Sequence, residues 1–305
     1  VIFVAIGFGF SFFASSKVDE ILTQPIKAEG VRFQSGSVET SIGFLNTRKI
    51  LRNSKLTLKE VTFDFPEISI NVDSSQARIN IPNVEGELPD GIRLKGTGAV
   101  LSAPISSNAD SFRIDFEMTN LVASADGIQA SARLIKGDVI KGDKSLYFNN
   151  LEFIISELEW NATNPGSGGI ENLIYKEKLA LVAGKINSEV FLSANKFHHQ
   201  EGTKEETFES AEVQAKYSAK SKDSSLNTPF ILQEINKNGF ENVLQKYQLE
   251  LINGNIVIRK LKTDDFSLGT LSYHEIVDRG EGKHKADLKI EIEDIDTPNF
   301  KSRLS

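Results

Sequence analysis

The apolar residues of this 305-residue chain follow three different patterns from one end to the other. Residues 1–16 read VIFVAIGFGFSFFASS and carry no charge. Residues 17–55 place short apolar clusters at helical spacing, which predicts a helix that ends near Pro25 or Gly30 and a second one over 43–52. From Leu56 onward, apolar side chains recur at every second position, the pattern of strands with one buried face.

The period of two continues along most of the remaining chain, with turn residues between the runs. In the last run, Leu288, Ile290 and Ile292 alternate with Lys289 and Glu291. Long helical patterns do not alternate with these strands, so a parallel α/β fold is disfavoured and an antiparallel meander is predicted. We expect a mainly β fold: an N-terminal transmembrane helix, then an elongated, curved antiparallel sheet with a few short helices, among them 171–178 and 229–245.

One string recurs and predicts where a strand changes its buried face. Leu56-Thr-Leu-Lys-Glu-Val-Thr-Phe63 returns at Leu146–Phe153, and a shorter copy lies at Ile256–Leu261. The shared form, apolar-x-apolar-x-x-apolar, contains a one-residue slip that turns the following side chains to the other face and bends the strand. The alternative is coincidence among strand-rich segments; if the likeness is real, it marks repeated units of one curved sheet.

Residues 1–16 allow three interpretations. As a helix they would rise about 24 Å, somewhat less than the roughly 30 Å of a bilayer core. A retained membrane anchor, incomplete at its N-terminus in this numbering, is favoured because the run is apolar on every face. A cleaved signal peptide ending near Ala14-Ser15-Ser16 is the second interpretation, and a buried core helix is the third.

The chain is expected to be organised in four parts: an anchor at 1–16, a helical juxtamembrane segment at 17–55, a first β half at 56–165, and a second β half at 166–305 with a helical insert near 229–245. The Gly- and Pro-rich segment 161–169 marks the boundary between the halves. The polar residues 198–206 are expected to form a long hairpin tip.

Composition and motifs exclude several kinds of function. The absence of cysteine removes disulfides and thiolate chemistry, and a net charge of −7 argues against nucleic-acid partners. His198 and His199 suggest a metal pair, but neighbouring residues of a strand point to opposite faces. Nucleophile elbows, phosphate loops and calcium loops do not occur in the sequence, so we predict a protein that is not an enzyme and has no cofactor or bound metal.

The stretch from the anchor to Phe65, together with the string at Leu56–Phe63 and its copy at Leu146–Phe153, resembles the start of AsmA-like proteins of the Gram-negative envelope. The resemblance covers about 70 residues and rests on apolar, degenerate motifs; the chain is also short for that family. It implies a single-pass bacterial inner-membrane protein whose bulk lies in the periplasm, with a curved sheet associated with lipid handling or envelope maintenance. It supplies no catalytic residues.

Two classes of function therefore remain open. The sheet either handles lipid through an apolar groove, or serves as a scaffold subunit of a larger envelope-spanning complex such as a motor or secretion machine. The partners would be the membrane through residues 1–16 and either lipid or envelope proteins. The candidate contact residues are the large aromatic side chains of the apolar face: Phe63, Phe65, Phe112, Phe116, Phe148 and Phe153.

Overall fold

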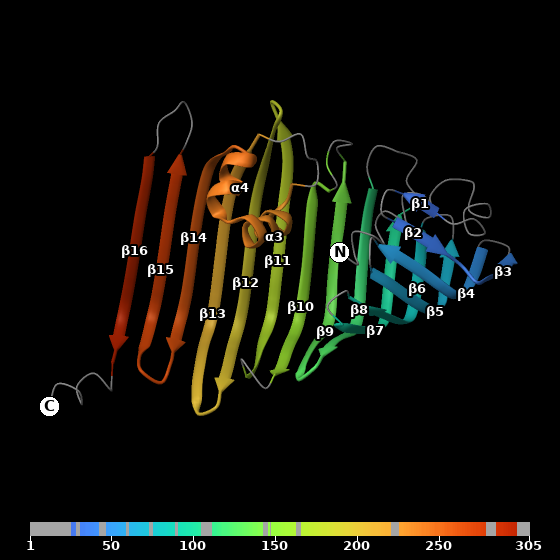
Figure 1. Cartoon of the computed structure of the whole chain (residues 1–305), viewed down its shortest axis with the longest axis horizontal. Coiled ribbons are helices and arrows are strands. Elements are labelled where there is room, and N and C mark those ends of the chain that lie inside the picture. Colours follow the sequence, from blue (N-terminus) through green and yellow to red (C-terminus); the bar gives the residue numbers. More distant parts are fainter. Residues whose placement is uncertain are drawn as a thin grey trace. The chain divides into compact units, whose positions relative to one another are not determined.

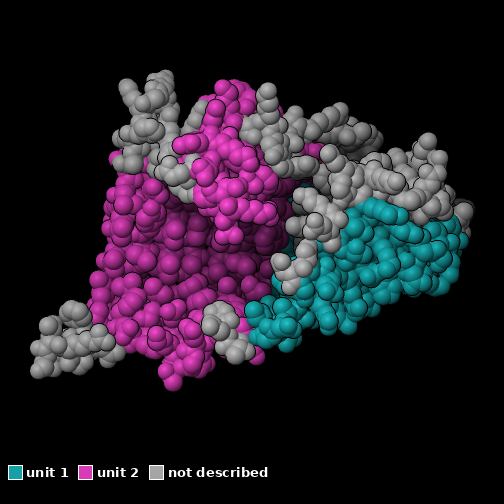
Figure 2. Space-filling model, in the orientation of Figure 1, with its two compact units in different colours: residues 1–139 teal, residues 140–305 magenta. Residues whose placement is uncertain are grey.

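The protein is mainly β, and its strands pair antiparallel in nearly sequential order (Figure 1). The computed structural model describes residues 26–28, 31–42, 47–58, 61–72, 76–88, 91–104, 112–142, 146, 148–162, 166–220, 226–278 and 285–297. The chain divides into two compact units, residues 1–139 and 140–305, coloured separately in Figure 2. This boundary differs from the expected one: segment 161–169 joins two strands inside the second unit.

The first unit is a sheet with the strand order β1-β2-β4-β5-β6-β7-β8-β9, with β3 paired to β4. Its strands are β1 Ile26–Ala28, β2 Val31–Gln34, β3 Ser37–Ile42, β4 Thr47–Leu58, β5 Val61–Val72, β6 Gln76–Glu87, β7 Arg93–Pro104, β8 Phe112–Ala125 and β9 Ile128–Lys141, the last of which ends two residues inside the second unit.

The core of this unit is built from the alternating side chains that the sequence indicated. Phe63 is 2 % exposed and Leu51 is fully buried, and Phe65, Phe116 and Met118 are buried with them. Phe63 and Phe65 share one face of β5 because they are two residues apart, while Asp64 between them is exposed. The period-two pattern therefore predicted correctly which side chains share a face, and the structure shows that this face is buried.

The second unit is a sheet of seven strands in the order β10-β11-β12-β13-β14-β15-β16. The strands are β10 Asn150–Ala162, β11 Ser167–Val182, β12 Lys185–Glu201, β13 Lys204–Ala219, β14 Leu249–Lys262, β15 Ser267–Asp278 and β16 Lys285–Asp296. Between β13 and β14 the chain forms two helices, α3 Thr228–Asn238 and α4 Phe240–Lys246, which lie on one face of the sheet (Figure 1).

The two helices occupy the predicted insert near 229–245, and the local sequence explains their ends. The side chain of Asn227 accepts a hydrogen bond from the main-chain N–H of Phe230 at 3.0 Å, and Pro229 fits the first turn. Gly239 separates the helices with a φ of 79°, a conformation that glycine adopts without strain. Ile231 of α3 and Val243 and Leu244 of α4 are the buried apolar side chains of the pair.

Two other predictions of helices were wrong. Residues 47–52, expected in a helix, belong to β4, and 171–178 belong to β11. In both segments pairing with neighbouring strands outweighs weak helical spacing. The predicted hairpin tip at 198–206 is confirmed, and its strands run further than expected, to Glu201 and from Lys204.

The predicted anchor at residues 1–16 lies outside the described residues. Within the described part of the chain, none of the helices is both long and apolar enough to cross a bilayer.

Candidate functional site

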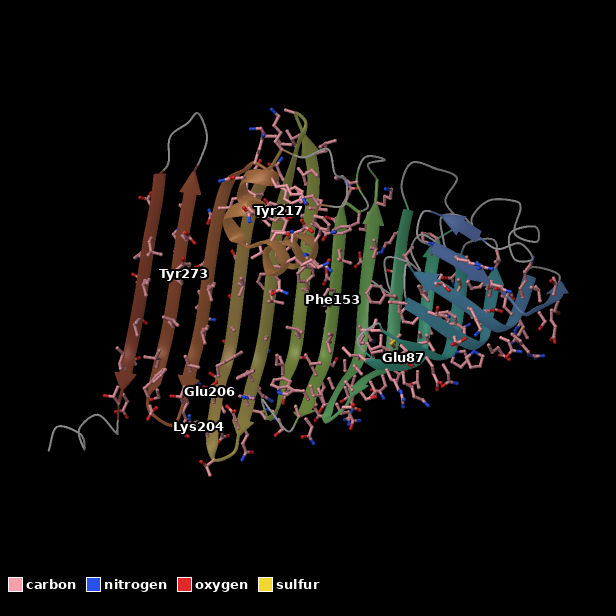
Figure 3. All side chains as sticks on the ribbon, viewed as in Figure 1. Glu87, Phe153, Lys204, Glu206, Tyr217 and Tyr273 are labelled. Carbon is pink, nitrogen blue, oxygen red and sulfur yellow. The ribbon has the colours of Figure 1, made fainter. Side chains whose placement is uncertain are left out.

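The seven strands of the second unit align their apolar side chains in rows that cross the sheet. One row, which we call the tyrosine row, consists of residues that pair directly from each strand to the next: Phe153, Tyr175, Leu192, Val213, Ile256, Tyr273 and Ile290. Residues opposite one another in a ladder share a face, so all seven side chains lie on the same side of the sheet. Phe153 and Tyr175 stack, with ring centroids 4.9 Å apart, and Figure 3 labels Phe153 and Tyr273 on this face.

The next row, two residues along each strand, differs in containing two carboxyl groups. This glutamate row is Leu151, Glu177, Val190, Ala215, Gly254, Glu275 and Leu288, again paired consecutively. We call the face that carries both rows the apolar face. The opposite face carries Lys and Glu side chains that form ion pairs, such as Lys176–Glu152 at 3.0 Å and Lys216–Glu189 at 3.0 Å.

A line of irregular backbone crosses this sheet, at residues that match the apolar-x-x-apolar part of the recurring string. Asn172, Lys196, Lys260 and Asp294 have φ between 47° and 55°, and each is the third residue of an apolar-x-x-apolar string. A residue with such a positive φ forms a β-bulge, which shifts the alternation by one residue. The apolar side chains before and after it therefore stay on one face.

The recurring string is therefore confirmed as a slip within a strand only at Ile256–Leu261, where Lys260 has a φ of 53°. In the copy at Leu56–Phe63 the two intervening polar residues fall between β4 and β5, and in the copy at Leu146–Phe153 they fall at the start of β10.

A buried carboxyl group ties the helix pair to the apolar face. Glu177 on β11 is 1 % exposed. It accepts hydrogen bonds from the Tyr175 hydroxyl at 2.6 Å and the Ser188 hydroxyl at 2.8 Å. It also accepts hydrogen bonds from the main-chain N–H and the hydroxyl of Thr228, at 2.9 and 3.0 Å. A buried carboxyl group is tolerated only with such donors, and here they include the first turn of α3.

Two tyrosines near Glu177 have raised pKa values. Burial, and then the negative charge of Glu177, raise the pKa of Tyr175 and of Tyr217 well above their usual range. The Tyr217 hydroxyl is buried without a hydrogen-bond partner of ordinary geometry among the described residues. Figure 3 shows Tyr217 beneath the helices. Both phenols are therefore protonated, and the cluster acts as a structural anchor for α3.

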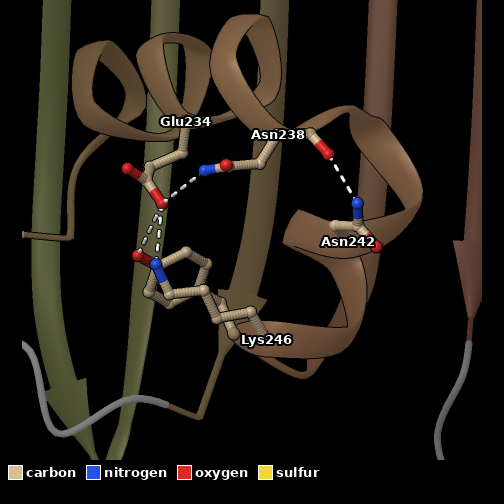
Figure 4. A network of polar contacts seen from close by, with 5 residues as sticks. Glu234, Asn238, Asn242 and Lys246 are labelled. Atoms are coloured by element: carbon tan, nitrogen blue, oxygen red, sulfur yellow. Dashed lines mark hydrogen bonds and ion pairs between the residues drawn. The ribbon is translucent and has the colours of Figure 1, made fainter.

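A second group of polar contacts joins the two helices to each other (Figure 4). One carboxylate oxygen of Glu234 accepts hydrogen bonds from Lys246 Nζ at 2.8 Å, Asn238 Nδ2 at 3.3 Å and the Tyr247 hydroxyl at 3.3 Å. Lys246 lowers the pKa of Glu234. The side-chain amide of Asn242 donates to the carbonyl of Asn238 at 2.6 Å. These contacts hold α4 against α3.

Exposure of the apolar face increases with distance from the helices. Next to the helices, Leu179, Ile186 and Val190 are buried, and the tyrosine row is half-buried from Leu192 to Tyr273. Along β16 the apolar side chains are among the most exposed: Leu288 at 61 %, Ile290 at 56 %, Ile292 at 47 % and Ile295 at 59 %. Figure 2 shows the helix pair standing above one part of this face and a recessed surface beside it.

The six phenylalanines expected to line one open groove lie in different environments. Phe63, Phe65 and Phe116 are core residues of the first unit, and Phe148 is 3 % exposed in the second. Phe112 lies at the start of β8, where its side chain is outside the description. Only Phe153 lies on the half-buried apolar face. A groove lined by these phenylalanines is therefore not what the structure shows, because four of the six are buried.

The residues that define this face were not predicted from the sequence. Tyr175-x-Glu177 and Tyr273-x-Glu275 repeat the same triplet, and that repetition was the available signal. His198 and His199 point to opposite faces as expected: a Cβ on Gly169 would meet the His198 ring, while His199 stacks on Trp160 at 6.1 Å. Among the described residues, acidic and histidine side chains do not gather in threes as a metal site would require.

Neither a protein-family model, nor a curated protein, nor a solved structure matches the chain.

Proposed function

We propose that the second unit is a non-enzymatic lipid-binding module, whose apolar face receives the acyl chains of a membrane lipid. The observation that carries the proposal is the uneven covering of one continuous apolar face. The helices α3 and α4 bury the β11–β13 part, whereas the four apolar side chains of β16 are between 47 % and 61 % exposed. Contiguous exposed apolar surface marks an interaction site in soluble folds.

The dimensions of the exposed part suit an acyl chain. Leu288 to Ile295 spans seven residue steps along β16, about 23 Å at 3.3 Å per residue. Neighbouring strands lie about 4.8 Å apart, so β14, β15 and β16 together offer a strip about 10 Å wide. Each methylene group that is fully buried contributes about 0.8 kcal/mol, so a long chain covered on one side by this strip gains part of that free energy at each methylene.

The AsmA-like resemblance points in the same direction but stays a prediction, as do the inner-membrane anchor at residues 1–16 and the periplasmic location. If all three hold, the apolar face would lie close to the membrane from which lipids are drawn. The proposal does not depend on them, since it rests on the second unit alone.

Photo-crosslinking of the full chain with a diazirine-bearing phospholipid tests the proposal. The double variant Ile290→Asn, Ile292→Asn makes the apolar face of β16 polar and should reduce lipid adducts on the second unit about tenfold. The matched double variant Lys289→Asn, Glu291→Asn changes the opposite face of the same strand without altering net charge, and should label within twofold of the wild type. Equal labelling of both variants would overturn the proposal.

A second candidate is a scaffold role, and one observation favours it. β16 is the last strand in the strand order, and one of its two edges is not paired with any strand in the described part of the chain. An unpaired strand with exposed apolar side chains can add a strand from a partner protein. Native mass spectrometry of the protein isolated from cells separates the two. A stoichiometric protein partner without bound lipid would favour the scaffold.

A further inference from the structure

The apolar face carries the same tyrosine–glutamate pair twice, four strands apart. Tyr175 and Tyr273 both belong to the tyrosine row, and Glu177 and Glu275 both belong to the glutamate row. In each pair the hydroxyl donates to the carboxylate two residues later, at 2.6 Å on β11 and 2.9 Å on β15. The two pairs therefore occupy equivalent positions on one face of one sheet.

The first pair shows how a carboxyl group at this position binds a segment that covers the sheet. Glu177 accepts the N–H and the hydroxyl of Thr228 in the first turn of α3, beside the Ser188 hydroxyl. The segment that covers the apolar face is thus held by hydrogen-bond donors at the glutamate, while its own apolar side chains Ile231, Val243 and Leu244 are buried. A donor group at the carboxylate and apolar atoms around it is the arrangement this sheet accepts.

The second pair has the same carboxylate acceptor, but among the described residues it receives no hydrogen bond from a helix. Among the described residues, Tyr273 is the one hydrogen-bond donor to the Glu275 side chain, and it uses one of the two carboxylate oxygens. The residue opposite on β14 is Gly254, where an added Cβ would meet nothing within 4 Å. Ala215 follows on β13. Small residues thus leave open space beside Glu275, and the exposed Leu288 lies opposite it on β16.

We propose that Glu275, oriented by Tyr273, binds the primary ammonium group of an amphiphile whose hydrocarbon chain lies on the apolar face of β14–β16. This inference rests on the lipid-binding function proposed above and names the headgroup class. An ammonium group supplies three N–H donors and a charge opposite to the carboxylate, whereas a fatty-acid carboxylate would be repelled. The net charge of −7 on the chain also favours a cationic ligand over an anionic one.

Binding of three single-chain probes to the full chain tests this assignment: dodecylammonium, dodecanol and dodecanoate, measured by calorimetry below their micellar concentrations at pH 7. The wild type should bind dodecylammonium about fivefold more tightly than dodecanol, and dodecanoate more weakly than either. Glu275→Gln should remove the preference for dodecylammonium over dodecanol, and Glu275→Lys should reverse the order so that dodecanoate binds best.

The control is Glu291→Gln, which removes the same charge from the opposite face of the neighbouring strand and should leave the preference unchanged. Any binding to the apolar residues 1–16 is common to all variants and cancels in the comparison. Ethanolamine, which has the ammonium group and no chain, should not bind; if it binds as tightly as dodecylammonium, a free amine and not a lipid is the ligand.

The outcomes separate this inference from the proposed function. Equal binding of the three probes to the wild type, or an unchanged preference in Glu275→Gln, overturns the headgroup assignment and leaves the lipid-binding function standing. Failure of all three probes to bind overturns both.

Discussion

The carboxyl group of Glu177 accepts a hydrogen bond of 2.9 Å from the main-chain N–H of Thr228, and so joins the first turn of α3 to strand β11. Glu177→Ala would leave this N–H and the Tyr175 and Ser188 hydroxyls buried without their acceptor. We expect a loss of about 2–4 kcal/mol in the free energy of unfolding of the second unit. Glu177→Gln keeps one oxygen acceptor and should cost less.

Urea unfolding followed by fluorescence measures this loss, because Trp160, the single tryptophan of the chain, lies on β10 of the same unit. Glu189→Gln, on the exposed face of β12, is the control and should change the free energy by less than about 0.5 kcal/mol. An Ala variant at 177 as stable as this control would show that the helix pair is held by packing alone.

Gly168 and Gly254 both lie in strands of the second unit and should respond oppositely to a methyl group. A Cβ on Gly168 would lie 2.4 Å from the Trp160 ring and 2.4 Å from the His198 carbonyl oxygen, so Gly168→Ala should cost about 1–3 kcal/mol and shift the Trp160 emission. A Cβ on Gly254 meets nothing within 4 Å, so Gly254→Ala should be neutral or slightly stabilising. Thermal melts and emission spectra check both, and equal effects would contradict the packing described.

Asn172 tests the line of irregular backbone. Its φ of 49° is tolerated by Asn but costs a β-branched residue more, so Asn172→Val should destabilise the second unit by about 1–2 kcal/mol. Asn172→Gly should be neutral or stabilising. As a control, Asn187→Val places the same residue at a regular position of β12, where Val is favoured. If both Val variants behave alike, Asn172 does not adopt this conformation in solution.

The contact between Glu234 and Lys246 predicts how the helix pair responds to acid. Because the pKa of Glu234 is lower in the folded protein than its ordinary 4.5, its contribution is fully present above pH 4.5 and is lost as the pH falls through the folded pKa. The pKa of Lys246 is raised by the same contact, so its contribution is lost only at strongly alkaline pH.

We therefore expect Glu234→Gln to lower the melting temperature slightly at pH 7, and the difference from wild type to shrink as the pH falls below 4.5. Glu189→Gln serves again as the control. A difference that grows on acidification would show that the carboxylate of Glu234 is not stabilised by Lys246.

Local pattern was enough for some features and not for others. The sequence correctly placed Phe63 and Phe65 on one apolar face, because alternation in an antiparallel strand depends only on the chain's own period, but it did not show that this face is buried and not an open groove. A single helical insert was predicted from the apolar spacing after Pro229, and its division into two helices at Gly239 was not. Residues 171–178 were misassigned, since Ile174, Tyr175 and Lys178 fit a helical period as well as a strand, and only pairing with β10 and β12 decides between them.

The slip strings show the same limit. The sequence displayed apolar-x-x-apolar several times, but whether a slip lies inside a strand or in a turn depends on where strands end, and that is set by their neighbours. The copy at Ile256–Leu261 lies inside β14, and the copy at Leu56–Phe63 spans the connection between two strands.

By itself, then, the sequence determined the mainly β class, the alternation of buried and exposed side chains, and the short helical insert, because these follow from local periodicity and capping. Tertiary structure decided which residues share a row across seven strands, and so which part of the apolar face is covered. Tyr273 and Glu275 could not be chosen from the sequence, since their significance comes from residues on other strands: Gly254 and Leu288 beside them, and Tyr175 and Glu177 four strands away. Such relationships require the register of pairing, which a single strand does not contain.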